Sequence, residues 1–200
     1  MGNTHKQSCA YPVNDIFSSI QGEGFWTGLP VTFIRFAGCN LACDFCDTDY
    51  SMKEILTADE ILRRLESWPA PTVVLTGGEP LIHPLKPLLK RLQSAHYRIH
   101  LETNGTFSVP EGFFDWIAVS PKTDMPVLRE CNELRVLLKK GEVPRDFNIR
   151  AEHYFVSPLN PSLNNPQKFD HDNLCYCLEY VLGHPKWRLN VQLHKYLDIP

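Results

Sequence analysis

The stretch that decides the fold is residues 31–46, VTFIRFAGCNLACDFC, in which an apolar run leads directly into three closely spaced cysteines. Residues 31–38 are rich in β-branched and aromatic side chains and end in glycine, a pattern that predicts a strand. Cys39, Cys43 and Cys46 follow at once. We therefore expect a strand that leaves the sheet in a loop carrying three thiols.

Strands and helices alternate outward from this stretch. Residues 57–60, TADE, form a capping box that predicts an amphipathic helix running to Trp68. Further strands are expected at residues 72–76, 97–103, 116–119, 134–138, 153–156 and 188–193, and further helices at about 85–95 and 172–182. This alternation predicts a parallel sheet. A complete barrel needs about 250 residues, so we expect a single-domain α/β fold over residues 1–200, an incomplete parallel β/α barrel.

The last predicted helix contains two of the seven cysteines. Cys175, Leu178 and Leu182 recur at helical spacing and share one face. Cysteine is a small hydrophobe that is commonly buried. We therefore interpret Cys175 and Cys177 as core residues without a functional role.

Composition and charge exclude several classes of protein. Hydrophobic residues make up 43% of the chain and charged residues 22%, which is typical of a globular domain and not of a disordered one. With a net charge of -3 and no long basic run, direct nucleic-acid binding is not expected. The sequence has no apolar signal core and no membrane-length apolar run, so we expect a cytoplasmic protein with reduced thiols and no membrane partner.

The three clustered cysteines indicate a metal or iron-sulfur site, because their loop can direct all three thiolates toward one point. One alternative is a zinc knuckle, which would need a fourth ligand nearby. Iron-sulfur clusters of four irons usually have four cysteine ligands. A cluster held by three would leave one iron open, and an open iron favours catalysis over electron transfer alone.

Polar segments end three other predicted strands. These are residues 76–80, TGGEP, residues 102–105, ETNG, and residues 120–122, SPK. Each segment alone is more often an ordinary turn. Because the carboxyl ends of parallel strands meet at one edge, we expect all three to lie near the cysteine loop.

The Cys-x3-Cys-x2-Cys loop after the first parallel strand, with Phe45 before its last cysteine, resembles the signature of the radical S-adenosylmethionine superfamily. The resemblance implies a partial barrel of the radical SAM type and a [4Fe-4S] cluster on Cys39, Cys43 and Cys46. The free iron would bind S-adenosylmethionine, whose cleavage gives a 5'-deoxyadenosyl radical. It also implies that the cofactor contacts are Phe45, Cys46, Asp47, Gly78, Ser120, Pro121 and Lys122.

Within that superfamily, residues 17–24, FSSIQGEG, and 191–200, VQLHKYLDIP, resemble the 7-carboxy-7-deazaguanine synthase family of the queuosine pathway. The resemblance implies an N-terminal substrate segment at about 11–30 and a C-terminal segment at about 191–200 that closes over the substrate. The reaction would be a radical ring contraction of 6-carboxy-5,6,7,8-tetrahydropterin to 7-carboxy-7-deazaguanine with loss of ammonia. The implied substrate contacts are Ile20, Gln21, Gly22, Glu23, Arg35, Thr76, His194 and Pro200.

Two of these residues also have simpler interpretations. Arg35 interrupts an apolar strand, and a buried guanidinium needs an anion, which could be an internal carboxylate such as Glu23 or the substrate's carboxylate. His194 could be a core histidine with satisfied hydrogen bonds. The family resemblance favours the substrate for both, and it gives the Thr48 hydroxyl a place in a Mg2+ site shared with the substrate.

The partners implied by the family are a pterin substrate, a second copy of the chain in a homodimer, and an electron donor such as flavodoxin or ferredoxin. A glycyl-radical enzyme activase is a competing enzyme class. An iron-sulfur or zinc module without catalysis is a competing non-enzymatic class. Gln21, Glu23 and the C-terminal segment argue against the activase, and Arg35 with the glycine-rich segment argues against the module.

Overall fold

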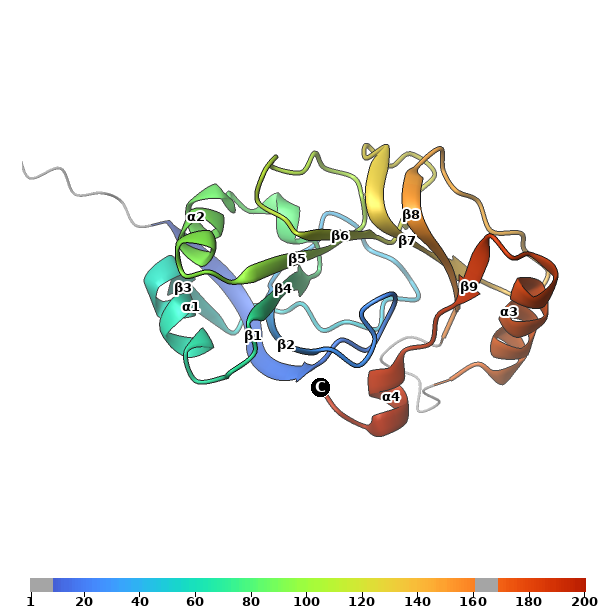
Figure 1. Ribbon diagram of the computed structural model, residues 1–200, viewed down its shortest axis with the longest axis horizontal. Coiled ribbons are helices and arrows are strands. Elements are labelled where there is room, and N and C mark those ends of the chain that lie inside the picture. The colour runs from blue at the N-terminus through green and yellow to red at the C-terminus, as the bar shows by residue number, and fades with distance from the viewer. Residues whose placement is uncertain (1–8, 161–168) are drawn as a thin grey trace, which may run out of the picture.

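The computed structural model describes residues 9–160 and 169–200, and its strands form a single curved sheet (Figure 1). The order across the sheet is β3-β1-β2-β4-β5-β6-β7-β8-β9. The strands are β1 (Ala10–Ile20), β2 (Pro30–Phe36), β3 (Glu54–Thr57), β4 (Thr72–Gly77), β5 (Arg98–Thr103), β6 (Trp116–Val119), β7 (Glu130–Leu138), β8 (Arg150–Pro158) and β9 (Trp187–Leu189).

From β2 to β9 every neighbouring pair of strands is parallel, which confirms the predicted incomplete parallel barrel. The sheet stays open, with β3 at one edge and β9 at the other. Strands β1 and β3 were not predicted from the sequence. β1 pairs antiparallel with β2 and β3 and so extends the sheet beyond its parallel part.

The helices are α1 (Ala58–Leu65), α2 (Lys86–Ser94), α3 (His171–Gly183) and the short α4 (Leu193–Leu197), with a 3-10 turn η1 (Pro80–Ile82). Helices α1, α2 and α3 lie outside the curve of the sheet, whereas α4 lies at its open side and residues 21–29, between β1 and β2, lie on its inner side (Figure 1). The capping box is confirmed: the Glu60 amide donates to the Thr57 hydroxyl at 3.3 Å, and the Thr57 amide donates to the Glu60 carboxylate at 2.7 Å. Helix α1 ends at Leu65, short of the predicted Trp68.

Two apolar clusters stabilise the two halves of the sheet. The first packs strands β1 to β5 against α1 and α2 and includes the fully buried Ile34, Leu75 and Leu89. The second packs β7 and β8 against α3 and includes Val156 and Cys177. Each fully buried leucine or isoleucine contributes about 1.5–3 kcal/mol, so the helices on the outside hold the sheet in its curved form.

The interpretation of α3 was wrong in part. Cys177 is fully buried, as expected, but Cys175 is exposed. Leu178 and Leu182, which share its face, are 46% and 79% exposed. The helix packs through the opposite stripe, because the Asn173 side chain donates to the Leu159 carbonyl at 2.7 Å and fixes which face meets the sheet.

The last strand is also shorter than predicted. β9 ends at Leu189, and the chain then turns and enters α4 at Leu193. The turn occurs because the Asn190 side chain points inward, where its carbonyl accepts from the Gly24 amide at 2.6 Å. In the described ranges, no helix has the length and apolarity needed to cross a membrane.

Candidate active site

A cavity of about 460 Å³ opens at the carboxyl ends of the parallel strands. Nearly all of the site residues predicted from the sequence line this cavity, although they come from distant parts of the chain. Those that line it are Ile20, Gln21, Gly22, Glu23, Arg35, Cys39, Cys43, Phe45, Cys46, Asp47, Thr48, Thr76, Gly78, Ser120, Lys122, His194 and Pro200. Pro121 is the exception, since it is buried between Ser120 and Lys122 and does not line the cavity.

The cysteine loop forms one wall of the cavity. Cys39, Cys43 and Cys46 are half-buried free thiols, and all three border the cavity. Burial raises the pKa of the Cys43 thiol, and the nearby ammonium of Lys122 opposes that rise. No three His, Cys, Asp or Glu side chains in the described ranges are placed to share a single metal ion. Three thiols on one loop that all border the same cavity fit a four-iron cluster, in which each cysteine binds a different iron.

The glycine pair at the end of β4 allows the backbone to pass directly beside the cysteine loop. A Cβ atom on Gly78 would clash with the Gly38 carbonyl and would lie 2.7 Å from Cys39 Cβ. The next amide, that of Glu79, donates to the Gly38 carbonyl at 3.1 Å. Only glycine at position 78 permits this approach, which fixes the end of β4 against the loop.

Glu79 joins the ends of β4 and β5. It is fully buried, and its carboxylate accepts from the Asn104 amide at 2.7 Å and from the Thr103 hydroxyl at 2.9 Å. Burial raises the pKa of this carboxyl, and the hydrogen bonds oppose the rise. The Asn104 side chain in turn donates to the Asn40 side chain at 3.0 Å, so the network holds the cysteine loop as well.

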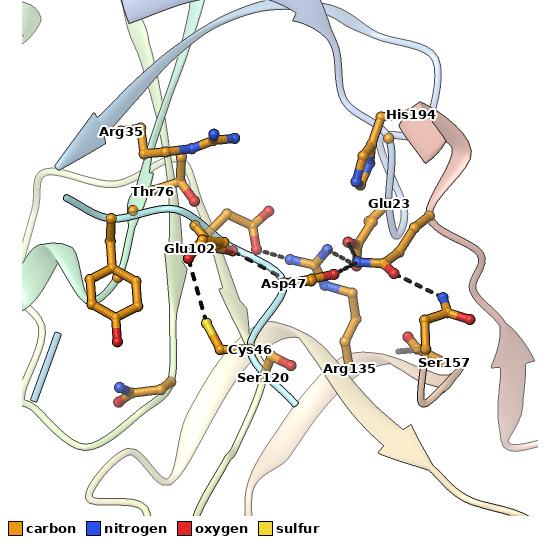
Figure 2. A pocket seen from close by; sticks show the side chains of 18 of the residues that line it. Glu23, Arg35, Cys46, Asp47, Thr76, Glu102, Ser120, Arg135, Ser157 and His194 are labelled. Atoms are coloured by element: carbon orange, nitrogen blue, oxygen red, sulfur yellow. Dashed lines mark hydrogen bonds and ion pairs between the residues drawn. The ribbon is translucent and has the colours of Figure 1, made fainter. Parts of the chain in front are cut away.

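Arg35 extends from β2 into the cavity and is half-buried. Its guanidinium lies over the Phe17 ring, 5.0 Å from the centroid. Burial lowers its pKa, and this shift is opposed by the charges of three carboxylates, those of Asp15, Asp49 and Asp47. In the described part of the chain it makes no ion pair, and Glu23, its suggested internal partner, pairs with another arginine. Figure 2 shows Arg35 beside Thr76, apart from that second group.

The second arginine is Arg135 of β7, which sequence analysis missed. Its side chain is 6% exposed and lies between Glu23 and Glu102 (Figure 2), with Glu133 as a third carboxylate neighbour. Nη1 is 2.9 Å from Glu23 Oε2, Nη2 contacts Glu102 Oε2, and Nε is 3.0 Å from Glu133 Oε1. Burial tends to raise the pKa of Glu23, but the charge of Arg135 holds it below its usual value.

The C-terminal segment is attached to the cysteine loop and to residues 21–29. The Lys195 ammonium is 2.6 Å from Asp47 Oδ2, and the Gln192 amide donates to the same oxygen at 2.9 Å. The Leu193 amide donates to the Gly22 carbonyl at 2.9 Å, which brings His194 against Gly22. Burial lowers the pKa of His194. At the chain end, the Ser19 hydroxyl donates to the Pro200 carbonyl at 2.9 Å.

Lys122 and Thr48 occupy the polar side of the cysteine loop. The Lys122 ammonium is 2.5 Å from the Ser120 hydroxyl and faces Glu23 and Asp47. Burial lowers its pKa. The Thr48 hydroxyl is 3.5 Å from Asp47 Oδ1. This side therefore offers one cation and several oxygen atoms to a ligand.

Some cavity residues were not assigned from the sequence. They are Arg135, Ser157, Asn160, Gln192 and Lys195, whereas Glu102 belongs to residues 102–105, which were expected near the cysteine loop and do line the cavity in part. Arg135 carried a usable signal, because it interrupts the apolar residues 134–138, LRVLL, as Arg35 interrupts residues 31–37. Gln192 and Lys195 carried none, since their partners are distant in the sequence.

The fold and the cysteine loop define the class of protein. A partial parallel barrel with three cysteines on the loop after its first parallel strand is a radical S-adenosylmethionine enzyme. In agreement, the model of the Radical SAM superfamily matches residues 33–135.

Full-length similarity then identifies the family. The chain is 39% identical over 188 residues to the 7-carboxy-7-deazaguanine synthase of Bacteroides thetaiotaomicron, covering 94% of this chain and 97% of the relative. It is 37% identical to the enzyme of the same name from Bordetella pertussis, covering 96% and 100%. The solved structure of QueE from Escherichia coli superposes with a TM-score of 0.70 at 26% identity, covering 92% and 95%. The chain belongs to the 7-carboxy-7-deazaguanine synthase family.

Proposed function

We propose that this protein converts 6-carboxy-5,6,7,8-tetrahydropterin to 7-carboxy-7-deazaguanine with loss of ammonia, acting as a radical carbon-nitrogen lyase in queuosine biosynthesis. The observation that carries the proposal is the meeting of three distant segments in one cavity. The cysteine loop, Arg35 of β2 and His194 of the C-terminal segment all line it. A cluster, its cofactor and an anionic substrate could therefore bind side by side.

Cys39, Cys43 and Cys46 would hold the [4Fe-4S] cluster, and the cavity beside them would hold S-adenosylmethionine. When bound, these groups supply the radical that abstracts hydrogen from the substrate. The backbone at Gly78 is free of side-chain obstruction next to Cys39. We assign the cofactor contacts to this glycine and to Phe45, Cys46, Asp47, Ser120 and Lys122, with the buried Pro121 shaping the backbone between the last two.

Arg35 would bind the carboxylate of the pterin. Its half-buried position and its lack of an ion pair in the described residues leave a positive charge available inside the cavity. A guanidinium can hold a carboxylate through two parallel hydrogen bonds. The ring would meet Gln21 and Glu23, and Ile20, Gly22, Thr76, His194 and Pro200 would complete the contact surface.

A magnesium ion would lie between Thr48 and the substrate carboxylate. Hydroxyl and carboxylate oxygens suit Mg2+, which takes one or two protein ligands and fills its octahedron with substrate and water. The Thr48 hydroxyl faces the cavity within 3.5 Å of Asp47 Oδ1. Replacing Thr48 with alanine should raise the Mg2+ concentration needed for half-maximal turnover, whereas an unchanged Mg2+ dependence would argue against this site.

Anaerobic turnover tests the proposed function. Protein reconstituted with iron and sulfide should convert the carboxylated tetrahydropterin only when both a reductant and S-adenosylmethionine are present. The product is measured by mass spectrometry, together with 5'-deoxyadenosine. Cleavage of S-adenosylmethionine without conversion of the pterin would overturn the substrate assignment.

We also propose that the protein works in the cytoplasm as a homodimer and takes its electron from flavodoxin or ferredoxin. A radical enzyme of this superfamily needs an electron donor, and the small reduced carriers of the cytoplasm supply one electron at a time.

The proposed homodimer is tested by light scattering after size-exclusion chromatography, which should give twice the mass of the chain. The mass of a single chain would rule out the dimer.

A further inference from the structure

Arg135 occupies the floor of the cavity, where a free charge would be costly. It is almost fully buried, and its three carboxylate neighbours come from different parts of the chain. Glu23 belongs to the loop after β1, Glu102 to β5 and Glu133 to β7. A buried guanidinium is stable only with close, well-oriented partners. One arginine thus connects the N-terminal substrate segment to two strands of the barrel.

The same carboxylates also orient two amide side chains. Glu102 Oε1 accepts from the Gln21 side-chain amide at 2.9 Å, and Gln21 Oε1 accepts from the Glu23 backbone amide at 3.2 Å. On the other side, Glu23 Oε1 accepts from the Gln192 side-chain amide at 3.2 Å. The direction of the Gln21 amide group is therefore set by Glu102, whose own position is set by Arg135.

Arg135 itself is not available to a ligand anion. Its two terminal nitrogens point at Glu23 and Glu102, and Nε lies 3.0 Å from Glu133 without an aligned hydrogen bond. Three carboxylates surround this guanidinium, and two of them, Glu23 and Glu102, line the cavity and give its floor an excess of acceptor oxygens. Such a floor suits a ligand edge rich in N–H donors, and repels an anionic one.

We propose that Arg135 is a positioning residue for the pterin substrate. It fixes Glu23 and Glu102 so that these carboxylates and Gln21 present a rigid set of acceptors and donors to the aminopyrimidinone edge of the ring. This inference rests on the proposed function and deepens it. Arg35 then binds the carboxylate of the substrate, and the side chains held by Arg135 bind the edge of its ring.

The geometry requires arginine at this position. A guanidinium directs its three nitrogens outward in one plane and can meet three carboxylates at once, whereas lysine offers a single compact charge. Without that plane, Glu23 and Glu102 would repel each other and move apart. A displacement of about 1 Å in a substrate-positioning group can lower the rate roughly 100-fold.

The test compares Arg135→Lys and Arg135→Met with Arg150→Met as a matched control. Arg150 lies on the adjacent strand β8, is exposed, and pairs with Glu130 at 2.8 Å. Affinity for the pterin is measured by calorimetry on the anaerobic, cluster-loaded protein without reductant, so that no turnover occurs. Affinity for S-adenosylmethionine is measured in the same way.

Both Arg135 variants should bind the pterin roughly 10–100-fold more weakly, the loss expected when hydrogen bonds to a charged group are misaligned, while their affinity for S-adenosylmethionine changes no more than about twofold. With reductant present, they should form less product for each S-adenosylmethionine cleaved. The reason is that the radical abstracts hydrogen less efficiently from a ring that is poorly positioned. The Arg150→Met control should match the wild type in all three measurements. Glu102→Gln, which keeps the shape but removes one anion, should also weaken pterin binding selectively.

Equal losses of affinity for the pterin and for S-adenosylmethionine would show that Arg135 only stabilises the barrel, and would overturn the inference. Wild-type pterin affinity in both Arg135 variants would overturn it as well. If Arg135→Met does not fold, Arg135→Lys and Glu102→Gln decide the question by the same criteria. A wild-type protein that fails to bind the pterin would refute the proposed function itself, and this inference with it.

Discussion

Arg35 and Arg135 show how the same sequence feature can serve two purposes. Each interrupts an apolar strand and points into the same cavity. Arg35 is half-buried and has only the Phe17 ring as a close partner in the described residues, whereas Arg135 is nearly inaccessible and surrounded by Glu23, Glu102 and Glu133. The first is open to a ligand anion, and the second can act only through other side chains. A buried arginine predicts an anion, but only the fold tells whether the anion belongs to the protein.

The largest effect should follow removal of the open arginine. Arg35→Ala should lower kcat/KM for the pterin about 300-fold, equivalent to about 3.4 kcal/mol, because the substrate carboxylate loses its charged partner. The KM for S-adenosylmethionine should hardly change. Steady-state kinetics with each substrate varied in turn provides the measurement.

Arg98→Ala is the matched control for this experiment, since Arg98 is an exposed arginine at the start of β5. Arg35→Lys should recover part of the loss, because a point charge still attracts a carboxylate. Equal losses toward both substrates in Arg35→Ala would remove the contrast between the two arginines.

The second prediction concerns the excess negative charge around Arg135. Burial raises the pKa of Glu133 to about 7, and repulsion from Glu23 acts in the same direction, while the hydrogen bond from the Phe25 amide and the charge of Arg188 oppose the rise. A raised carboxyl pKa means that the folded state binds more protons than the unfolded state between about pH 4.5 and pH 7. The free energy of unfolding contributed by this group therefore falls as pH rises through that window, by about 2–3 kcal/mol.

Glu133→Gln should remove this dependence, because the amide does not ionise. Between pH 5 and pH 8 the melting temperature of the wild type should drop about 5–10 °C more than that of the variant. Subtracting the pH dependence of the variant from that of the wild type cancels the contribution of the other titrating groups. One of these is His100, because burial lowers its pKa to about 4. Parallel pH profiles would indicate that Glu133 is ionised throughout and that the cluster has no excess charge to relieve.

The smallest effect should follow replacement of Lys195, which keeps Asp47 from pairing with Arg35 and so leaves Arg35 available to the substrate. Lys195 neutralises Asp47 at 2.6 Å, and Asp47 is one of the carboxylates that act on Arg35. In Lys195→Met, Asp47 would compete with the substrate for Arg35, and the C-terminal segment would lose one attachment. The KM for the pterin should rise about tenfold, as expected for loss of a largely buried ion pair.

Lys186→Met serves as the control, because Lys186 forms an exposed pair with Asp146 at 3.2 Å. It should leave the kinetics unchanged. If the KM for the pterin is the same in Lys195→Met and in the wild type, Asp47 does not approach Arg35, and the C-terminal segment is held by its other contacts.

Much of the fold could be predicted because its signals are local. The capping box at Thr57, the run of apolar residues in β4 and the glycine after β2 each specify structure within a few positions. The cysteine spacing located the site for the same reason. Strand β6 was predicted with the bounds that the structure gives it, Trp116–Val119.

The features that were missed depend on partners far away in the sequence. β1 alternates polar and apolar residues irregularly around a bulge near Asp15, so its place beside β2 is visible only in the sheet. The face of α3 is chosen by Asn173, through bonds to Leu159 and Lys140. Arg135 finds its partner Glu23 across 112 positions. Periodicity within a window cannot report such choices.

The iron content of the anaerobically purified and reconstituted protein decides whether Cys39, Cys43 and Cys46 hold an iron-sulfur cluster. We predict about four irons and four sulfides per chain, with an electron paramagnetic resonance signal of the reduced cluster that changes when S-adenosylmethionine is added. Alanine at Cys39, Cys43 or Cys46 should abolish both the signal and the formation of 5'-deoxyadenosine. Stoichiometric zinc in place of iron, or cleavage of S-adenosylmethionine by any of the three alanine variants, would contradict this assignment.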